Sequence, residues 1–258
     1  MLKPERDYVK KLIEENSRIN GTGFFEMRKL CVETGVYQKA EGSALVKLGE
    51  TMVAVGIKMS VEEPFPDTPD EGILIVNAEF PPVASPEFEP GPPGEEAVEL
   101  ARVVDRGIRE SEAIDLEKLC IVPGEKVWGV FIDIHVLNDD GNLIDASGIG
   151  AISALLNAKI PKYDQENEEI IYAEKTDPLP VRKVPIPFTF AKIGGKILLD
   201  PCKEEEEAMD ARITVTIANE KICAMQKGHG GFFTSDEIKN VIKIATEKYK
   251  YVKEILNV

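Results

Sequence analysis

Residues 198–217 read LLDPCKEEEEAMDARITVTI, and the interpretation of the whole chain depends on them. An apolar strand end stops at Asp200-Pro201, four consecutive glutamates follow, and an alternation of apolar residues typical of a strand begins at Ile213. Eight charged side chains therefore lie between two expected strands. Loops between rigid elements often carry functional residues, so this segment is either a catalytic loop or a solvated one.

The C-terminal part of the chain predicts four strands and a final helix around this segment. The strands are expected at residues 186–191, 197–199, 213–218 and 222–226. The pairs Gly194-Gly195 and Asn219-Glu220 are suited to the turns between them. Thr234 and Glu237 have the spacing of a capping box, so the last helix is expected to begin there.

The N-terminal part predicts a hairpin, because two apolar runs at residues 44–48 and 51–55 flank Gly49-Glu50, a pair suited to a type II′ turn. Its other expected elements are helices at 4–15, 95–113 and 145–159 and strands at 36–38, 73–80 and 126–137. Residues 81–94 are expected to form a long exposed loop, and residues 163–181 a polar connector. Ser147 or Asp145 is expected to cap the helix at 145–159. This order predicts an α+β fold with helices on one side of a mixed sheet.

The composition limits the classes of function. The chain has 258 residues and a net charge of −15, so binding to nucleic acid would require a local basic patch. It contains no apolar run long enough to span a bilayer and no signal-peptide core near residue 1, so we expect a cytoplasmic protein without membrane contact. Four scattered cysteines and two histidines argue against a zinc site and a disulfide framework, and we expect neither metal nor cofactor.

Three arginines form a stripe on the helix expected at residues 95–113. Arg102, Arg106 and Arg109 are spaced i, i+4 and i+7 and therefore share one face. They either pair with neighbouring acidic residues or form a face that contacts phosphates. From the residues alone, ordinary surface pairing is the favoured interpretation in so acidic a chain.

Common catalytic motifs are absent from the sequence, including the phosphate-binding P-loop, H-E-x-x-H and G-x-S-x-G. The carboxylate candidates are Asp200, Glu204–Glu207 and Asp210. A run of four glutamates is typical of a solvated surface, because magnesium sites use a few carboxylates held by rigid elements. The glycines of Asp145–Gly150 favour close backbone packing over phosphate binding, because this turn contains no Arg or Lys.

Four segments in order resemble the ribonuclease PH family, and in particular the core of the archaeal exosome. They read GSALVKLGETMVAVGIKM, GIRESEAIDLEKLCI, WGVFIDIHVLNDDGNLIDA and LLDPCKEEEEAMDARITVTI, and the resemblance spans nearly the full chain. It implies the ribonuclease PH fold (ribosomal protein S5 domain 2-like), with mixed sheets and helices packed on them. It also implies one domain over residues 1–258, built from two ββα-type halves at about 25–160 and 183–258.

The resemblance also bears on activity, because catalytic members of the family degrade RNA from its 3′ end by phosphorolysis. Arg212 stands where catalysis needs an aspartate, Asp145–Gly150 lacks the arginine of the phosphate-binding turn, and Pro92–Glu96 replaces arginines that hold RNA. Asp200 remains. The resemblance therefore implies a non-catalytic subunit. One alternative is an active phosphate-dependent 3′–5′ exoribonuclease with Asp200 and its neighbours as the site. The other is a module built on Glu204–Glu207 that binds a divalent metal or an acidic partner.

The resemblance further implies partners. In the family, such a subunit pairs with a catalytic subunit, and three heterodimers form a hexameric ring under a trimeric cap of RNA-binding subunits. The non-catalytic chain shapes the neighbouring active site and contacts single-stranded RNA. Arg106 and Arg109 match the arginines that make this contact, which reverses the preference for simple surface pairing. Relatives usually read Arg-x-Asp-Gly-Arg where residues 18–22 read RINGT, which implies one basic contact fewer.

Overall fold

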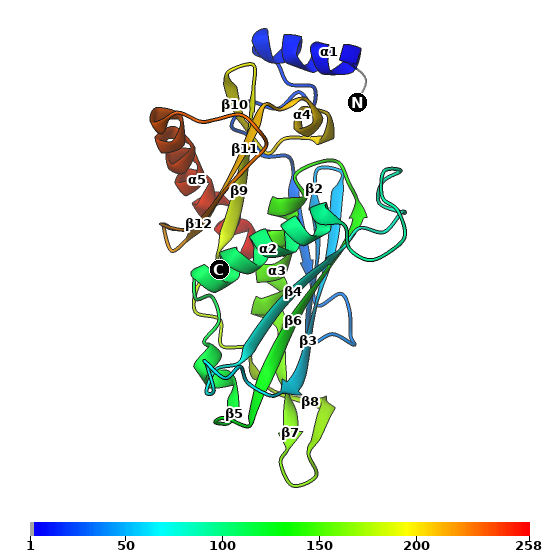
Figure 1. Cartoon of the computed structure of the whole chain (residues 1–258), viewed down its shortest axis with the longest axis vertical. Helices are drawn as coiled ribbons and strands as arrows, with labels where there is room; N and C mark the ends of the chain where they lie inside the picture. The colour runs from blue at the N-terminus through cyan, green and yellow to red at the C-terminus, as the bar shows by residue number, and fades with distance from the viewer. Residues whose placement is uncertain (1–2) are drawn as a thin grey trace.

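The computed structural model describes residues 3–258, which form two large sheets, a two-stranded hairpin and five α-helices (Figure 1). The helices are α1 (Lys3–Glu14), α2 (Glu95–Glu110), α3 (Leu143–Asn157), α4 (Lys203–Ala208) and α5 (Ser235–Leu256), with a 3-10 turn at Leu116–Leu119. None of the helices in this described part of the chain is both long and apolar enough to cross a bilayer.

The first sheet has the strand order β1-β2-β3-β6-β4, with β5 added beside β6. Its strands are β1 (Leu30–Thr34), β2 (Gly42–Leu48), β3 (Thr51–Glu62), β4 (Ile73–Glu79), β5 (Cys120–Val122) and β6 (Lys126–Asn138). Neighbouring strands are antiparallel except β4, which runs parallel to β6. The sheet is therefore mixed, and α2 lies in the connection between its two parallel strands.

The second sheet is antiparallel, with the order β10-β9-β11-β12. Its strands are β9 (Ile186–Ile193), β10 (Lys196–Leu199), β11 (Ala211–Ala218) and β12 (Lys221–Gly228). The separate hairpin consists of β7 (Lys159–Asp164) and β8 (Glu169–Pro178).

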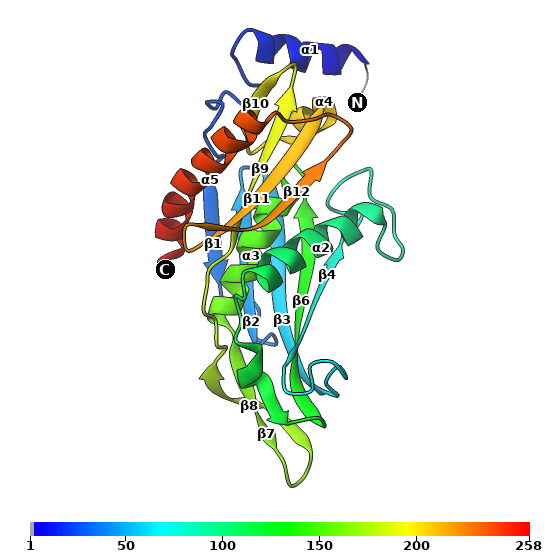
Figure 2. The same ribbon diagram turned by 60° about the vertical axis from the view of Figure 1, so that its left-hand side comes forward.

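Helix α3 is the centre of the core. Every residue from Ile144 to Leu155 is buried, as expected for a helix enclosed on all sides. It packs against β2 and β3 of the first sheet and against β9 of the second, so it lies between the two sheets (Figure 2). A side chain at Gly148 would lie 2.5 Å from Cγ of Pro187, and one at Gly150 would lie 2.8 Å from a methyl of Val55. The packing role predicted for these glycines is confirmed.

The other two long helices bury one face each. Helix α2 presents Leu100, Val104 and Ile108, spaced four residues apart, to the core, and it contacts both β4 and β12. Helix α5 packs against β9 and β11. Its predicted capping box is confirmed, because the side chain of Thr234 accepts from Glu237 N at 3.3 Å and Glu237 accepts from Thr234 N at 2.7 Å.

The hairpin of β2 and β3 is also confirmed. Leu48 pairs with Thr51, and the two intervening residues form the turn. Gly49 has φ +60°, whereas Glu50 is not among the residues with positive φ, which is the pattern of a type II′ turn.

Several expected elements were wrong. The strand expected at 36–38 does not form, because β1 ends before Gly35 at φ +71° and both Val36 and Tyr37 are exposed. The connector expected at 163–181 is largely occupied by β7 and β8. Helices α2 and α3 lie between two sheets, not on one side of a single sheet.

Two further corrections concern helix ends and the glutamate run. Neither Ser147 nor Asp145 caps α3; the cap is Asn142, in the left-handed conformation (φ 54°), whose side chain accepts from Asp145 N at 3.4 Å. Helix α2 ends at Glu110, three residues before the predicted end. The glutamates expected to form a loop build helix α4 instead.

Candidate functional site

Asp200 is buried at the end of β10, with its backbone in the left-handed region at φ +54°. One carboxylate oxygen accepts from Arg28 Nη2 at 2.8 Å and from Asn142 Nδ2 at 2.7 Å. The other accepts from the backbone N of Arg28 at 2.8 Å and from its Nε at 3.1 Å. Both oxygens are therefore committed to partners inside the protein.

Arg28 extends this contact to the turn before α3. Its guanidinium also donates to the carbonyl and carboxylate oxygens of Asp140, at 2.7 and 3.0 Å, and to Gly141 O at 3.1 Å. Burial alone would lower the pKa of Arg28, but the hydrogen bonds and charges of Asp200 and Asp140 outweigh it and raise that pKa. Arg28 thus joins three segments that are far apart in the sequence.

A second buried ion pair lies beside the first. Arg18 donates from Nε and Nη2 to the two carboxylate oxygens of Glu205, at 2.9 and 2.6 Å, and both side chains are fully buried. Its other donors reach the carbonyls of Leu199 at 3.0 Å and Asp200 at 2.8 Å. Arg18 is therefore an internal residue, and it holds α4 against the end of β10.

This geometry corrects the interpretation of Glu204–Glu207 as a solvated run or a shared metal site. Glu205 points into the interior toward Arg18, whereas Glu204 is exposed, so these glutamates do not converge. Within residues 3–258, no group of three or more His, Cys, Asp or Glu side chains is arranged to hold a metal ion.

Asp145 lies in the first turn of α3 and is also buried. One of its oxygens accepts from Asn142 Nδ2 at 2.8 Å and from Thr189 N at 2.9 Å, and the other from the Thr189 hydroxyl at 2.8 Å. Burial raises the pKa of Asp145 to about 7, although these hydrogen bonds oppose the shift. The segment Asp145–Gly150 is thus part of the core, joined to β9.

Arg212 lines a cavity of about 360 Å³, whereas Asp200 does not. The cavity lies among the start of α2, the start of α3, α4 and the beginning of β11. Its lining residues are Phe80, Glu87, Phe88, Glu96, Glu99, Leu100, Asp139, Leu143, Ile144, Lys203, Glu206, Glu207, Met209, Arg212 and His229. Arg212 donates from Nη2 to Glu99 at 2.6 Å. Lys203 binds Asp139 at 2.7 Å and Glu87 at 3.3 Å, so both residues are paired within the cavity wall.

Glu206 is a cavity carboxylate with a raised pKa. Burial raises the pKa of Glu206 to about 7, against the opposing effects of a 3.0 Å hydrogen bond from Asn142 N and the charge of Arg212. This pKa lies above the ordinary glutamate value, so folding favours the protonated acid. The contribution of Glu206 to the free energy of unfolding is fully present below the unfolded pKa of about 4.3. It is lost as the pH rises through the folded pKa of about 7.

We therefore expect Glu206→Gln to flatten the pH dependence of stability. Glutamine keeps an acceptor for Asn142 N but carries no charge to desolvate. Wild type should lose roughly 2 kcal/mol more unfolding free energy than the variant between about pH 5.5 and pH 8, because about 1.5 pH units of this range lie below the folded pKa and one unit corresponds to ~1.4 kcal/mol. Urea denaturation at the two pH values measures this. Glu204→Gln, at an exposed position in the same helix, is the control, and equal slopes for Glu206→Gln and wild type would contradict the assignment.

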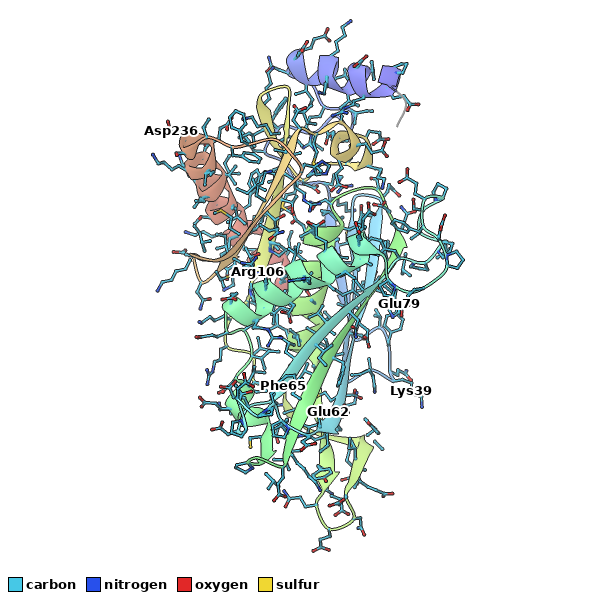
Figure 3. All side chains as sticks on the ribbon, in the orientation of Figure 1. Lys39, Glu62, Phe65, Glu79, Arg106 and Asp236 are labelled. Carbon is cyan, nitrogen blue, oxygen red and sulfur yellow. The ribbon has the colours of Figure 1, made fainter. Side chains whose placement is uncertain are left out.

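The predicted arginine stripe is present on α2, but its members differ in availability. Arg109 is held by Asp105 at 2.8 Å and by Leu74 O at 2.9 Å, and Asp105 raises its pKa. Arg106 makes one long contact, 3.3 Å to Gln226, and extends from α2 on the side of β12 (Figure 3). Arg102 is exposed and has no hydrogen bond or ion pair to any residue that the structure describes. Surface pairing therefore holds for Arg109, while Arg106 and Arg102 remain accessible.

The two remaining segments singled out by the sequence are Pro92–Glu96 and residues 18–22, and only the second contacts Asp200, through Arg18. Pro92–Glu96 is exposed and leads into α2, where Glu96 reaches the cavity. In residues 18–22, Arg18 is internal, and the half-buried Thr22 donates from its hydroxyl to Asn20 Oδ1 at 2.8 Å. The sequence reasoning missed the roles of Arg28, Asn142 and Glu205. These residues are brought together only by the fold, and no local motif marks them.

Family models match both parts of the chain. The model described as 3′ exoribonuclease family, domain 1, matches residues 26–161, and the model for domain 2 of that family matches residues 183–248. The chain is 54% identical over 254 residues to the exosome complex component Rrp42 of Pyrococcus furiosus, covering 97% of this chain and 92% of that one. It is 49% identical over 254 residues to the protein of the same name from Methanothermobacter thermautotrophicus, covering 98% and 94%.

Solved structures agree with these matches. A chain from a structure described as the Archaeoglobus fulgidus exosome with RNA bound to the active site superimposes with a TM-score of 0.90 at 49% identity, over 97% of both chains. A chain of an archaeal exosome core gives 0.87 at 45% identity, over 99% of this chain and 97% of that one. The expected ribonuclease PH fold is thereby confirmed. Because the two family models and these relatives span most of its length, the chain belongs to the 3′ exoribonuclease (RNase PH) family.

Proposed function

We propose that this protein is a non-catalytic component of the archaeal exosome, a complex that degrades RNA from the 3′ end. Its relatives from archaea carry the name exosome complex component Rrp42. The observation that carries the non-catalytic assignment is Arg212. It stands on β11 where the resemblance requires a catalytic aspartate, and its guanidinium is paired with Glu99 beside the cavity.

The neighbouring carboxylates do not replace the missing aspartate. Both oxygens of Asp200 are bound by Arg28 and Asn142, and Asp145 is enclosed between α3 and β9. Inside the cavity, Glu99 neutralises Arg212, while Lys203 neutralises Asp139. A general acid or a magnesium ligand would require a carboxylate that is free to reach the substrate or the ion. The hydrogen bonds and ion pairs inside the protein already occupy these carboxylates.

In this proposal, the chain pairs with a catalytic family member, three such heterodimers form a hexameric ring in the cytoplasm, and a trimeric cap of RNA-binding subunits covers the ring. The chain shapes the partner's active site and contacts single-stranded RNA. It acts as one domain built from two halves, because one hydrophobic cluster contains Val46 and Ile132 of the first sheet together with Phe188 and Val215 of the second.

The proposal is tested by incubating the pure chain with single-stranded RNA, Mg²⁺ and inorganic phosphate. No nucleoside diphosphate should be released. The same preparation mixed with the catalytic subunit of the same organism should release it, which controls for the quality of the RNA and the assay. Nucleoside diphosphate release by the pure chain would establish the alternative, an active phosphorolytic exoribonuclease.

We further propose that Arg106 and Arg109 contact RNA in the assembled ring, with Arg106 making the larger contribution. Arg106→Glu should weaken RNA binding by roughly tenfold at low salt and should lower the slope of log affinity against log salt by about 1. Arg109→Glu should weaken binding less, because Asp105 and Leu74 O already hold this guanidinium. Fluorescence titration of labelled RNA at several salt concentrations measures both effects.

The control is Lys239→Glu, which reverses an exposed charge on α5. It should leave RNA affinity unchanged, and neither arginine variant should alter the mass of the ring. RNA affinity of Arg106→Glu that equals that of Lys239→Glu at low salt would contradict the proposed contact.

A further inference from the structure

A chain of buried hydrogen bonds leads from Asp145 of α3 through Thr189 of β9 to Thr214 of β11. The Thr189 hydroxyl oxygen lies 2.8 Å from Asp145 Oδ1 and 2.8 Å from the Thr214 hydroxyl oxygen. Thr189 and Thr214 are paired partners in the sheet, so their side chains point to the same face, on which α3 packs (Figure 2). Each of the three residues is at most 1% exposed, so the chain of hydrogen bonds is enclosed in the core.

The two carboxylate oxygens of Asp145 differ in the partners that they have. Oδ2 accepts from two N–H groups, Asn142 Nδ2 at 2.8 Å and the backbone N of Thr189 at 2.9 Å. Neither of these N–H groups can accept a hydrogen bond. Among the residues that the structure describes, the Thr189 hydroxyl is the one partner of Oδ1. A hydroxyl both donates and accepts, so a proton bound to Asp145 belongs on Oδ1.

The charges around Asp145 favour such a proton. Asp145 forms no ion pair with any residue described in 3–258, and Arg28 is committed to Asp200. Asp200 and Asp145 accept from the same Asn142 Nδ2, and the charge of Asp200 opposes ionisation of Asp145. Burial is the larger effect and raises the pKa of Asp145 to about 7. The other charged groups of the surrounding elements are Glu206 of α4, bound to Asn142 N, and Arg212 of β11, paired with Glu99 of α2.

We propose that Asp145, Thr189 and Thr214 form a proton-sensitive relay, in which binding of one proton at Asp145 reverses the direction of both hydroxyl hydrogen bonds. With Asp145 ionised, the Thr189 hydroxyl donates to Oδ1 and accepts from the Thr214 hydroxyl. With Oδ1 protonated, Oδ1 donates to Thr189, whose own hydrogen must turn to Thr214, since the described residues offer it no other acceptor. The proton is exchanged with solvent water, and only O–H bonds form and break.

The far end of the relay lies beside the accessible arginine of α2. Thr214 lines a small cavity together with Arg106 of α2 and Gln226 of β12. In the ionised state of Asp145, the Thr214 hydrogen is used in the bond to Thr189. In the protonated state that hydrogen is released, and the cavity wall gains a hydrogen-bond donor. A proton bound next to Asp200 thus changes the polarity of a cavity on the other side of the second sheet's inner face. This inference does not depend on the proposed function, because it concerns this chain alone.

A titration of the full chain followed by nuclear magnetic resonance tests the relay. The carboxyl carbon of Asp145 and the Cβ and hydroxyl resonances of Thr189 and Thr214 are recorded between about pH 5 and pH 9. We expect all three residues to titrate with one midpoint near pH 7. A Thr214 resonance that stays constant while Asp145 titrates would overturn the relay, and so would an Asp145 resonance that does not titrate in this range.

Variants of the first two members distinguish a relay from two neighbouring buried threonines. Asp145→Asn imitates the protonated acid, because its amide donates to Thr189 and its oxygen still accepts from N–H groups. It should hold Thr214 at its low-pH resonance throughout. Thr189→Val keeps the shape of the side chain but removes the link. Asp145 should still titrate in this variant, with a higher midpoint because a donor to its carboxylate is lost, whereas the response of Thr214 should disappear.

Two further variants are the controls. Thr189→Ser keeps the hydroxyl and should restore the response of Thr214. Thr216→Val removes another buried hydroxyl of β11, one without a hydrogen bond to the relay in the described structure, and should leave the response unchanged. Titration of Thr214 that persists in Thr189→Val would contradict the relay.

Neutron crystallography of the wild type at low and high pH decides the question if Thr189→Val or Asp145→Asn does not fold. Hydrogen positions should show Oδ1 of Asp145 protonated and Thr189 donating to Thr214 at low pH. At high pH, Thr214 should donate to Thr189, and Thr189 to Asp145. The same hydrogen positions at both pH values would overturn the inference.

Discussion

Arg28→Met is expected to lower the free energy of unfolding by about 3–5 kcal/mol, because it leaves the buried carboxylate of Asp200 without its charge partner. Asp200 would keep only two hydrogen bonds, from Asn142 Nδ2 and from the backbone N of residue 28. The carbonyl of Asp140 would lose the Arg28 donor as well, whereas Gly141 O would keep the Thr51 hydroxyl at 2.6 Å. Urea denaturation followed by circular dichroism measures the loss from the shift in the midpoint.

Two variants separate the ion pair from a general effect of losing an arginine. Arg102→Met removes an exposed guanidinium and should change stability by no more than about 0.5 kcal/mol. Adding Asp200→Asn to Arg28→Met removes the unpaired buried charge, so the double variant should be more stable than the sum of the single effects predicts. A loss below about 1 kcal/mol for Arg28→Met would show that the pair contributes no more than a surface contact.

Short sequence motifs correctly predicted the elements whose geometry depends on neighbouring residues. The hairpin at Gly49-Glu50 and the capping box at Thr234 formed as expected, because short-range geometry determines both. The hairpin of β7 and β8 was missed. Its alternation is obscured by charged residues on both faces, and only tertiary contacts such as that of Trp128 with Tyr163 reveal a buried side.

The candidate site was predictable only in part. The position of Arg212 could be inferred from the resemblance, and the structure places it beside a cavity. The burial of Asp200 could not be inferred, because its partner Arg28 lies 172 residues away in the sequence. Such a pair leaves no periodic or spacing signal in a single chain. The buried polar residues are recognisable only when the fold brings β10, α3 and the segment before β1 together.

The environment of the glutamate run Glu204–Glu207 also could not be predicted fully from the sequence. Charge runs usually lie in solvent, and composition alone favours that assignment for Glu204–Glu207. Glu205 is an exception because Arg18 supplies two hydrogen bonds to its carboxylate inside the protein. A buried carboxylate requires such a partner, and the partner lies 187 residues away.

Arg18→Met is expected to have the second large effect on stability, again about 3–5 kcal/mol. It leaves the carboxylate of Glu205 buried with only the donor from Cys202 N at 3.1 Å, and it removes the donors to Leu199 O and Asp200 O. Because Glu205 anchors α4, the amides of Lys203–Ala208 should also exchange with deuterium faster than in wild type. The unfolding midpoint in urea and native-state hydrogen exchange measure these two effects.

A double-mutant cycle with Glu205→Gln shows whether the pair itself is responsible. The effects of Arg18→Met and Glu205→Gln should fall short of additivity by about 1–3 kcal/mol, because each variant already breaks the same contact. Lys11→Met is the matched control, since Lys11 and Glu15 form an exposed pair at 4.0 Å whose loss should cost less than about 0.5 kcal/mol. Additive effects, or unchanged exchange of the α4 amides, would mean that α4 is held by its apolar contacts with α1 and β9 and not by Arg18.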